Sequence, residues 1–161
     1  MKKSWKRVLL AALVVCAVLS GLVSCKKQEA KGEYEHKATV SIDCSKIWAH
    51  EADLNADKAD YVPKDGVVLG ETEVFFDGEV TAYDLLQAVC QERKIQMDAE
   101  DSAYGKYVKG IAQLYAGDCG DMSGWMYKVN GEFAEVGCDA YTVQEGDEIC
   151  WVFICDYTTD C

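Results

Sequence analysis

The chain has 161 residues, of which 28 are Asp or Glu and 16 are Lys or Arg, so its formal net charge is −12 at pH 7. This length fits one domain with an additional segment better than two domains. The acidic balance argues against a nucleic-acid-binding protein, because nucleic-acid phosphates are contacted by basic patches. We interpret the charge as an aid to solubility outside the cytoplasm, with an acidic recognition surface as the alternative.

Residues 1–24 have the features of an export signal. Four of the first seven residues are basic, and the apolar run that follows, from Val8 to Leu19, is shorter than the roughly 20 apolar residues of a membrane span. Leu-Val-Ser-Cys at positions 22–25 resembles a bacterial lipobox, in which the Cys receives a diacylglyceryl group. We expect lipidation at Cys25 and attachment to the extracytoplasmic side of a bacterial membrane in the cell envelope. A soluble secreted protein cut nearby is the alternative.

The rest of the chain divides into a tether, one domain and a tail. We place the lipidated Cys and the tether at 25–37, the domain at 38–156 and the tail at 157–161. Alternating apolar and polar residues in ATVSIDCS, from position 38, predict a half-buried strand. A second strand is predicted for residues 67–76, VVLGETEVFF.

The polar stretch between these strands contains Asp53, Asn55 and Asp57 at the spacing that begins a calcium loop. The pattern then fails, since Lys58 replaces the turn Gly and Lys64 replaces the bidentate Glu. We therefore expect no metal site in this stretch.

EVTAYDLLQAVCQERKI, residues 79–95, predicts the main helix. Thr81 is the expected N-cap, and Asp84 follows at the spacing of a capping box. An apolar stripe at helical spacing is formed by Leu85, Leu86, Val89 and Cys90.

A β-hairpin is predicted in SGWMYKVNGEF, because Asn and Gly both tolerate positive φ at the turn. Trp125 and Tyr127 share one side with Val129, so we expect them in the core, with ligand contact as the alternative. Met126 lies on the other side. A last strand from 148 to 155 completes an α+β fold, a mixed sheet with one main helix on one face.

Three segments carry a family resemblance: TAYDLLQAVC, YVKGIAQLYAGDCGDMSGWMYKVNG and YTVQEGDEICWVF. In this order they resemble the transcobalamin-like C-terminal domain family, which is similar to the small C-terminal domain of the vitamin B12 carriers. The resemblance covers nearly the whole of residues 38–156, and the Gly-Trp-x-Tyr-x-Val-Asn-Gly segment is its most specific part. It implies a β-grasp-like α+β unit.

In the B12 carriers this small domain closes over one face of the corrin, opposite a helical barrel. The resemblance therefore implies a non-catalytic ligand-binding module with a corrinoid, such as cobalamin, as the candidate ligand and with no cofactor of its own. No such barrel precedes the domain in this sequence, so one half of the clamp is expected to bury about half of the ligand. The candidate ligand-binding residues are Phe133, Ala134, Val136, Tyr107, Met126, Trp125 and Tyr127.

Nine Cys occur, seven of them after position 25. Export favours disulfides among these seven, and no Cys-x-x-Cys or His–Cys spacing indicates a metal. We hypothesise one bridge from Cys119 to Cys138 across the hairpin and one from Cys44 to Cys155 between the first and last strands. An odd number leaves one thiol unpaired, and the pairing stays open for Cys90, Cys150 and Cys161.

The sequence contains no nucleophile elbow, no Cys–His pair in a recognisable context and no phosphate-binding Gly loop. We therefore expect no enzyme. A surface module that binds a protein or polymer partner, within an uptake or adhesion complex, is the alternative to a ligand-binding module.

Overall fold

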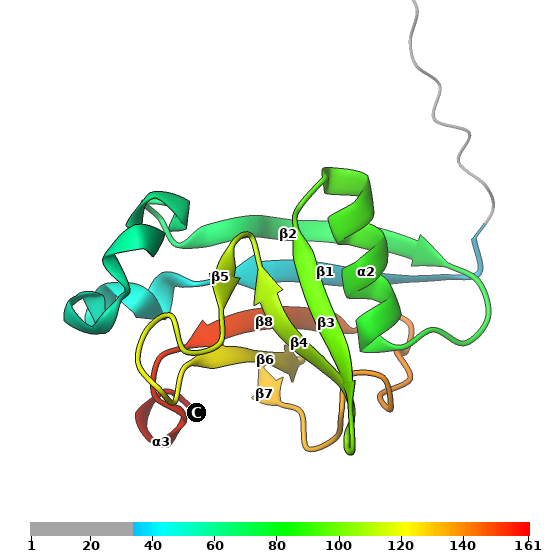
Figure 1. Ribbon diagram of the computed structural model, residues 1–161. Helices are drawn as coiled ribbons and strands as arrows, with labels where there is room; N and C mark the ends of the chain where they lie inside the picture. The colour runs from blue at the N-terminus through cyan, green and yellow to red at the C-terminus, as the bar shows by residue number, and fades with distance from the viewer. Residues whose placement is uncertain (1–33) are drawn as a thin grey trace, which may run out of the picture. The chain divides into compact units, whose positions relative to one another are not determined.

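The computed structural model describes residues 34–161 (Figure 1). The predicted export signal and the lipidation site at Cys25 lie outside them. Within the described part, no helix is long and apolar enough to cross a membrane. Its elements in chain order are β1 (His36–Asp43), three short 3₁₀ helices (Ser45–Ala49, Glu51–Asp53 and Ala56–Tyr61), β2 (Val67–Phe76), α2 (Ala82–Arg93), β3 (Met97–Ser102), β4 (Gly105–Ile111), β5 (Leu114–Tyr115), β6 (Gly124–Val129), β7 (Glu132–Phe133), β8 (Glu148–Ile154) and α3 (Tyr157–Asp160).

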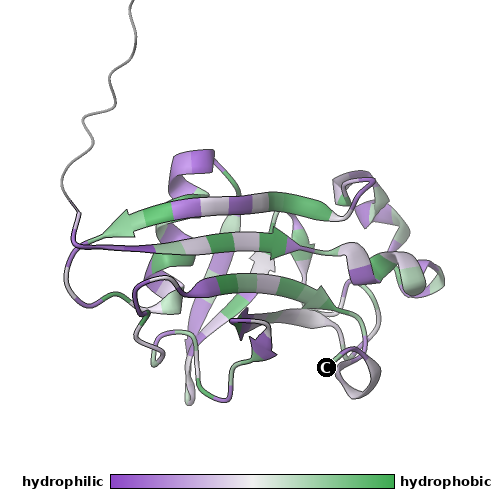
Figure 2. Cartoon of the chain, turned by 180° about the vertical axis from the view of Figure 1, so that it is seen from behind, coloured by the Kyte–Doolittle hydropathy of each residue, from purple (hydrophilic) through white to green (hydrophobic). Residues whose placement is uncertain are grey.

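The strands form two sheets. The larger sheet has the order β2-β1-β8-β6-β7 and is mixed, because β1 and β8 run parallel while its other pairs are antiparallel. The smaller sheet, β3-β4-β5, is antiparallel. Helix α2 and the smaller sheet cover one face of the larger sheet (Figure 1), and Figure 2 shows its strands from the opposite face. The predicted α+β fold with one main helix on one face of a mixed sheet is confirmed.

The core lies between the larger sheet and the layer formed by α2 and the smaller sheet. Its residues recur with period two along β1, where Ala38, Val40 and Ile42 are buried and their neighbours are not. In α2 the predicted stripe is buried as a whole, including Cys90. Apolar burial of this kind contributes about 25 cal/mol per Å² removed from water.

Helix α2 begins and ends where its local chemistry requires. Thr81 caps it: its side chain accepts a hydrogen bond from the Asp84 N–H while the Asp84 carboxylate accepts one from the Thr81 N–H, which confirms the capping box. Lys94 adopts φ +58, a left-handed conformation that ends the helix. The helix therefore begins directly after the expected N-cap and ends at Arg93, two residues before the end of the predicted stretch.

The predicted hairpin at Asn130 and Gly131 is confirmed as the β6–β7 connection, with φ +52 and +91 at the two turn residues. Asn130 also ties this turn to β8, donating from its amide to Asp147 at 2.9 Å and accepting from the Glu148 N–H at 2.9 Å. Asp147 is buried but accepts a further bond from the Tyr141 hydroxyl at 2.8 Å, so its charge is satisfied. These bonds hold β6 in register on β8.

Neither hypothesised disulfide is present in the structure, where all seven Cys within residues 34–161 are free thiols. Cys138 packs near α2, where its Sγ lies 3.5 Å from the Lys106 carbonyl. The Cys119 Sγ instead lies 3.6 Å from the carbonyl of His50, among the 3₁₀ helices. Cys119 and Cys138 therefore contact different parts of the domain.

Candidate functional site

The candidate site lies along the first half of β6. On one side β6 pairs with β8 over its full length, from Gly124 to Val129. On the other side, β7 pairs only with Lys128 and Val129, at the hairpin end. Two hollows open beside the half that β7 leaves uncovered, and both are lined by Tyr107, Trp125 and Met126. We call them the inner pocket and the β6 groove.

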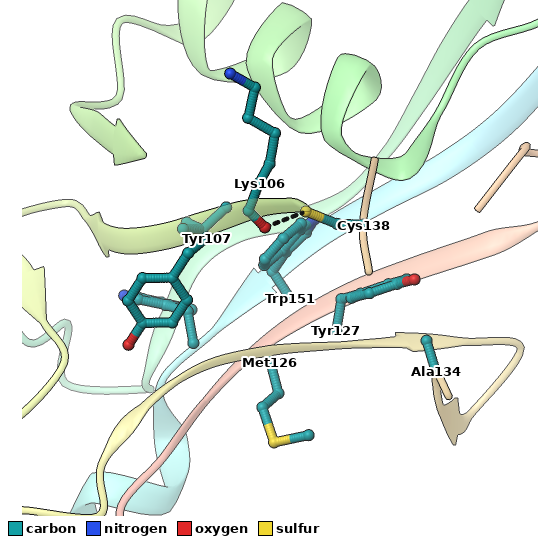
Figure 3. Close-up of a pocket in the computed structure, with 9 residues that line it drawn as sticks. Lys106, Tyr107, Met126, Tyr127, Ala134, Cys138 and Trp151 are labelled. Carbon is teal, nitrogen blue, oxygen red and sulfur yellow. Dashed lines mark hydrogen bonds between the residues drawn. The ribbon is translucent and has the colours of Figure 1, made fainter. Parts of the chain in front are cut away.

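The inner pocket is a hollow of about 150 Å³ between β4, β6 and the loop after β7 (Figure 3). Its floor is aromatic: the rings of Tyr127 and Trp151 stack with centroids 5.4 Å apart and planes inclined by 29°. In Figure 3 the side chain of Lys106 points away from the pocket toward α2, so only its backbone contributes to the wall. The lining residues are Lys106, Tyr107, Val108, Trp125, Met126, Tyr127, Ala134, Cys138 and Trp151.

The polar atoms around the inner pocket are mostly engaged by the protein itself. The Trp125 indole N–H donates to the Leu114 carbonyl at 2.9 Å, and the Tyr127 hydroxyl donates to the Val136 carbonyl at 2.8 Å. The indole N–H of Trp151 is buried and has no hydrogen-bond partner among the described residues. A buried donor without an acceptor is costly, and this N–H is covered by the protein rather than open to the pocket.

Two titratable groups of the pocket, the Cys138 thiol and the Tyr127 hydroxyl, are neutral at pH 7. Burial raises the pKa of the Cys138 thiol to about 11 and that of the Tyr127 hydroxyl to about 12. Neither group supplies a thiolate or a phenolate for chemistry at that pH. The pocket is therefore an apolar, uncharged surface.

The β6 groove is larger, about 410 Å³, and lies between β6, the end of β8 and helix α3. Its walls carry apolar side chains that remain open to water: Met122 is 43% exposed, Tyr107 42% and Tyr157 55%. Its floor includes Met126, whose Sδ lies 3.6 Å from the Cys161 Sγ. The lining residues are Tyr107, Met122, Ser123, Gly124, Trp125, Met126, Ile154, Tyr157 and Cys161.

Gly124 makes room in the β6 groove. A Cβ at this position would lie 3.6 Å from the Cβ of Ala116 and 3.9 Å from the Tyr107 hydroxyl, which are ordinary van der Waals distances. Gly124 has no positive φ, so its backbone does not demand glycine. A larger side chain here would fill the groove without straining the strand.

Helix α3 contributes Tyr157 to the groove wall and is held by the carboxylate of Asp160. Asp160 accepts hydrogen bonds from the backbone N–H groups of Cys155 at 2.9 Å and Asp156 at 3.1 Å. Burial acts against its charge, but these bonds and the nearby Lys46 and His50 keep the pKa of Asp160 below its usual value. The groove wall therefore depends on a charged carboxylate.

Five of the seven predicted ligand-binding residues line the inner pocket: Tyr107, Trp125, Met126, Tyr127 and Ala134. Trp125 and Tyr127 are also core residues, as their period-two side predicted. The other two line neither hollow. The Phe133 ring lies under the Lys128 ammonium at 4.4 Å, and Val136 is 50% exposed. A role in binding stays a prediction for all seven.

The sequence prediction missed the second wall of the groove, formed by Tyr157 and Cys161. We assigned residues 157–161 to a tail, whereas Tyr157–Asp160 form α3. A signal was present, because the Asp156 side chain accepts from the Thr158 N–H in the manner of an N-cap. Met122 lacked any such signal, since it lies in a loop with no periodicity.

Residues 53–57, which resemble the start of a calcium loop, belong to 3₁₀ helices and their connection. The Asn55 side chain accepts a hydrogen bond from the Asp57 N–H at 3.2 Å, so it caps a helix. Across residues 34–161, no three His, Cys, Asp or Glu side chains come together in a group that would hold a metal ion.

Comparison with known proteins gives one family match. A family model described as a domain of unknown function, DUF4430, matches residues 79–154, from just before α2 to the end of β8. It therefore includes β4 and β6, which line both hollows. No curated protein matches the chain.

The solved structures that are similar to the chain include the following two. One is a protein from Ruminococcus gnavus ATCC 29149, provisionally described as metal binding, with 18% identity, a TM-score of 0.45, and coverage of 74% of this chain and 97% of that one. The other is haptocorrin in complex with Cbi, with 18% identity and a TM-score of 0.45, covering 80% of this chain. The chain spans 28% of the length of haptocorrin. At these TM-scores neither structure bears on the ligand of this protein.

Proposed function

We propose that this protein is a non-catalytic ligand-binding module that takes a flat, largely apolar ligand of the corrinoid class against β6. The ligand would lie in the β6 groove and reach toward the inner pocket. In this proposal the domain is displayed on the extracytoplasmic side of a bacterial membrane through a lipid at Cys25.

One observation carries the proposal: exposed apolar side chains converge on a single hollow. Tyr107 comes from β4, Met122 from the loop before β6, and Tyr157 from α3. Three separate segments thus present large apolar groups to the same space, each more than two fifths open to water. Contiguous exposed apolar surface of this kind typically marks a binding site.

The chemistry of the site suits a ligand with an apolar face. The groove floor is formed by Gly124 and Met126, and Met side chains adapt readily to irregular apolar surfaces. The sequence resemblance to the small domain of the B12 carriers supports a corrinoid among such ligands. Corrinoids combine a broad ring face with amide side chains, and an amide oxygen could accept from the Trp151 N–H if the pocket wall opened.

The size of the site sets an expectation for affinity. Ligand pockets that enclose a small molecule have volumes of roughly 300–1,000 Å³ and bury most of its surface. A groove of about 410 Å³ beside a pocket of about 150 Å³ is in that range, but a corrinoid would be covered on one face only. We therefore expect a dissociation constant in the micromolar to millimolar range for the domain alone.

Calorimetric and spectroscopic titration of the 26–161 fragment with cobinamide and cobalamin tests the proposal. This fragment contains every element of the described domain. We expect saturable binding by the wild type. The absence of heat and of spectral change at millimolar ligand would reject corrinoid binding by this chain alone.

Two glycine variants assign the binding to the groove. Gly124→Leu fills the groove and should weaken binding at least about tenfold, which corresponds to about 1.4 kcal/mol. Gly70→Leu is the matched control, because Gly70 lies in β2, has no atom within 4 Å of an added Cβ and lines neither hollow. Equal affinity in the two variants would place the ligand elsewhere.

Palmitate labelling tests the proposed attachment. In a bacterial host, the wild type should incorporate labelled palmitate and Cys25→Ala should not. Cys161→Ala is a suitable control, since Cys161 is an exposed thiol far along the sequence from the lipobox. Equal, negligible labelling of wild type and Cys25→Ala would remove the anchor from the proposal.

A second candidate function, binding of a surface protein partner, rests on the β3–β4 hairpin. Its tip carries Tyr104, which is 96% exposed. Such an aromatic side chain on a tight turn is well suited to insertion into a partner. If pull-down from an envelope extract retains a partner with wild type but not with Tyr104→Ser, and cobinamide gives no heat, this candidate replaces the first.

A further inference from the structure

Strand pairing brings the loop before β6 close to the end of β8. Gly124 pairs with Ile154, so the antiparallel register sets Ser123 opposite Cys155. The buried Ser123 side chain accepts hydrogen bonds from the Cys119 N–H at 3.0 Å and the Gly117 N–H at 3.1 Å. The loop therefore folds back over Ser123 and places Cys119 beside Cys155.

The two side chains meet at this point. Cys119 and Cys155 line one hollow of about 210 Å³ with His50, Asp53 and Met122, and each thiol influences the pKa of the other. Each residue is nearly fully buried, at 2% exposed for Cys119 and 4% for Cys155. The sulfur atoms of Cys138 and Cys161 contact other residues, Lys106 and Met126 respectively.

We propose that Cys119 and Cys155 form an intramolecular disulfide when the protein meets an oxidant of the glutathione-disulfide class. In this exchange a Cys thiolate attacks the oxidant disulfide and releases one glutathione thiol. The second Cys thiolate then attacks the mixed disulfide and releases the other. Two S–H bonds break and one S–S bond forms, while the oxidant takes up the two electrons and the two protons.

The disulfide would act on the β6 groove from its outer end. Cys119 belongs to the loop that also carries Met122 and Ser123, and Cys155 joins Ile154 to α3. A covalent bond here links the two walls of the groove and limits how far they can separate. The bond itself is independent of any ligand, so its failure and the failure of the proposed function are separate outcomes.

The reduced pair is expected to react slowly at neutral pH. Burial raises the pKa of both thiols, so the thiolate that begins the exchange is scarce. The rate of disulfide formation should therefore increase as the pH rises. The hollow gives a small oxidant a path to the pair, since both Cys119 and Cys155 line it.

Peptide mapping of the full chain tests the proposal directly. The reduced protein is incubated with oxidised glutathione, alkylated under denaturing conditions and digested without reductant. We expect a cross-linked peptide joining Cys119 to Cys155, lighter by two hydrogens than the sum of its parts, with Cys44, Cys90 and Cys138 alkylated. Recovery of Cys119 and Cys155 in alkylated form, or linked to other Cys, would overturn it.

Two matched variants extend the test. Cys155→Ala removes one partner and should abolish the rise in melting temperature that the oxidant produces in the wild type. Cys138→Ala is equally buried, at 5% exposed, and should keep that rise. The opposite pattern, with the rise lost only in Cys138→Ala, would contradict the pairing. Peptide mapping of the wild type remains decisive if either variant fails to fold.

Discussion

The two faces of strand β6 differ in what their side chains are used for. On one face, Trp125 and Tyr127 are at most 7% exposed, and both use their polar atoms in hydrogen bonds to nearby carbonyls. On the other face, Gly124 and Met126 line an apolar groove that stays open, and Trp125 contributes to the groove lining from the core face. Trp125 and Tyr127 therefore stabilise the domain, while Gly124 and Met126 mainly supply open surface.

The largest expected effect is on the core face. Trp125→Ala removes a buried indole and its hydrogen bond to Leu114, and should lower the free energy of unfolding by about 3–5 kcal/mol. Met126→Ala, on the groove face, should lower it by less than half as much, because Met126 is only partly buried. Urea denaturation of the two variants measures both values. Equal losses would contradict the division between the faces.

The next effect concerns the groove wall and depends on pH. Asp160→Asn should lower the free energy of unfolding by about 1–2 kcal/mol at neutral pH, since it weakens charge-assisted hydrogen bonds to the start of α3. The folded-state pKa of Asp160 is below the usual 3.8, so its contribution is present above that value and is lost as the pH falls through the folded pKa.

Denaturation of wild type and Asp160→Asn as a function of pH measures this dependence. The difference between the two proteins should be constant near neutral pH and shrink once the pH drops below the usual carboxyl value. Asp101→Asn is a suitable control, since Asp101 is exposed and belongs to the distant β3. A difference that grew in acid would mean that the Asp160 charge destabilises the fold.

A smaller effect is expected for the Tyr127 hydroxyl. Tyr127→Phe keeps the ring stacked on Trp151 and removes the hydrogen bond to the Val136 carbonyl, at a cost of about 1 kcal/mol. Hydrogen exchange of residues 134–138 should increase, because this bond ties their loop to β6. Unchanged exchange there would show that the loop is held by other contacts.

The smallest effect on stability belongs to the groove rim. Met122→Ala should change the free energy of unfolding by no more than about 0.5 kcal/mol, because Met122 is an exposed loop residue. Its effect on ligand affinity should nevertheless exceed that of Phe133→Ala, since Phe133 lines neither hollow. Thermal denaturation and titration with cobinamide separate the two properties. The reverse order of affinities would favour the hairpin end as the site.

The fold was predictable from local patterns. Period-two burial in β1, the Thr81 capping box and the Asn130-Gly131 turn each depend on a few neighbouring residues, so the sequence displays them directly. The groove was predictable only in part, because its walls come from β4, the loop before β6 and α3. Met122 and Tyr157 become neighbours of β6 only through the tertiary fold, so no local sequence pattern indicates that they lie beside it.

The hypothesised Cys119–Cys138 disulfide, which the structure does not show, also rested on sequence spacing. Cys119 and Cys138 flank the hairpin in the sequence, but the loop that carries Cys119 turns back at Ser123 toward the end of β8. Pairing inferred from sequence spacing missed this turn. Which Cys lie together depends on strand register, which sets Ser123 opposite Cys155.

The most direct test of the account is backbone amide chemical-shift mapping of the 26–161 fragment during titration with cobinamide. The account predicts that the shifts that move are those of residues 122–126, Tyr107 and Tyr157, and that the same titration of Gly124→Leu leaves them in place. Shifts confined to β2 or to the β3–β4 hairpin tip, or no shifts at millimolar ligand, would contradict it.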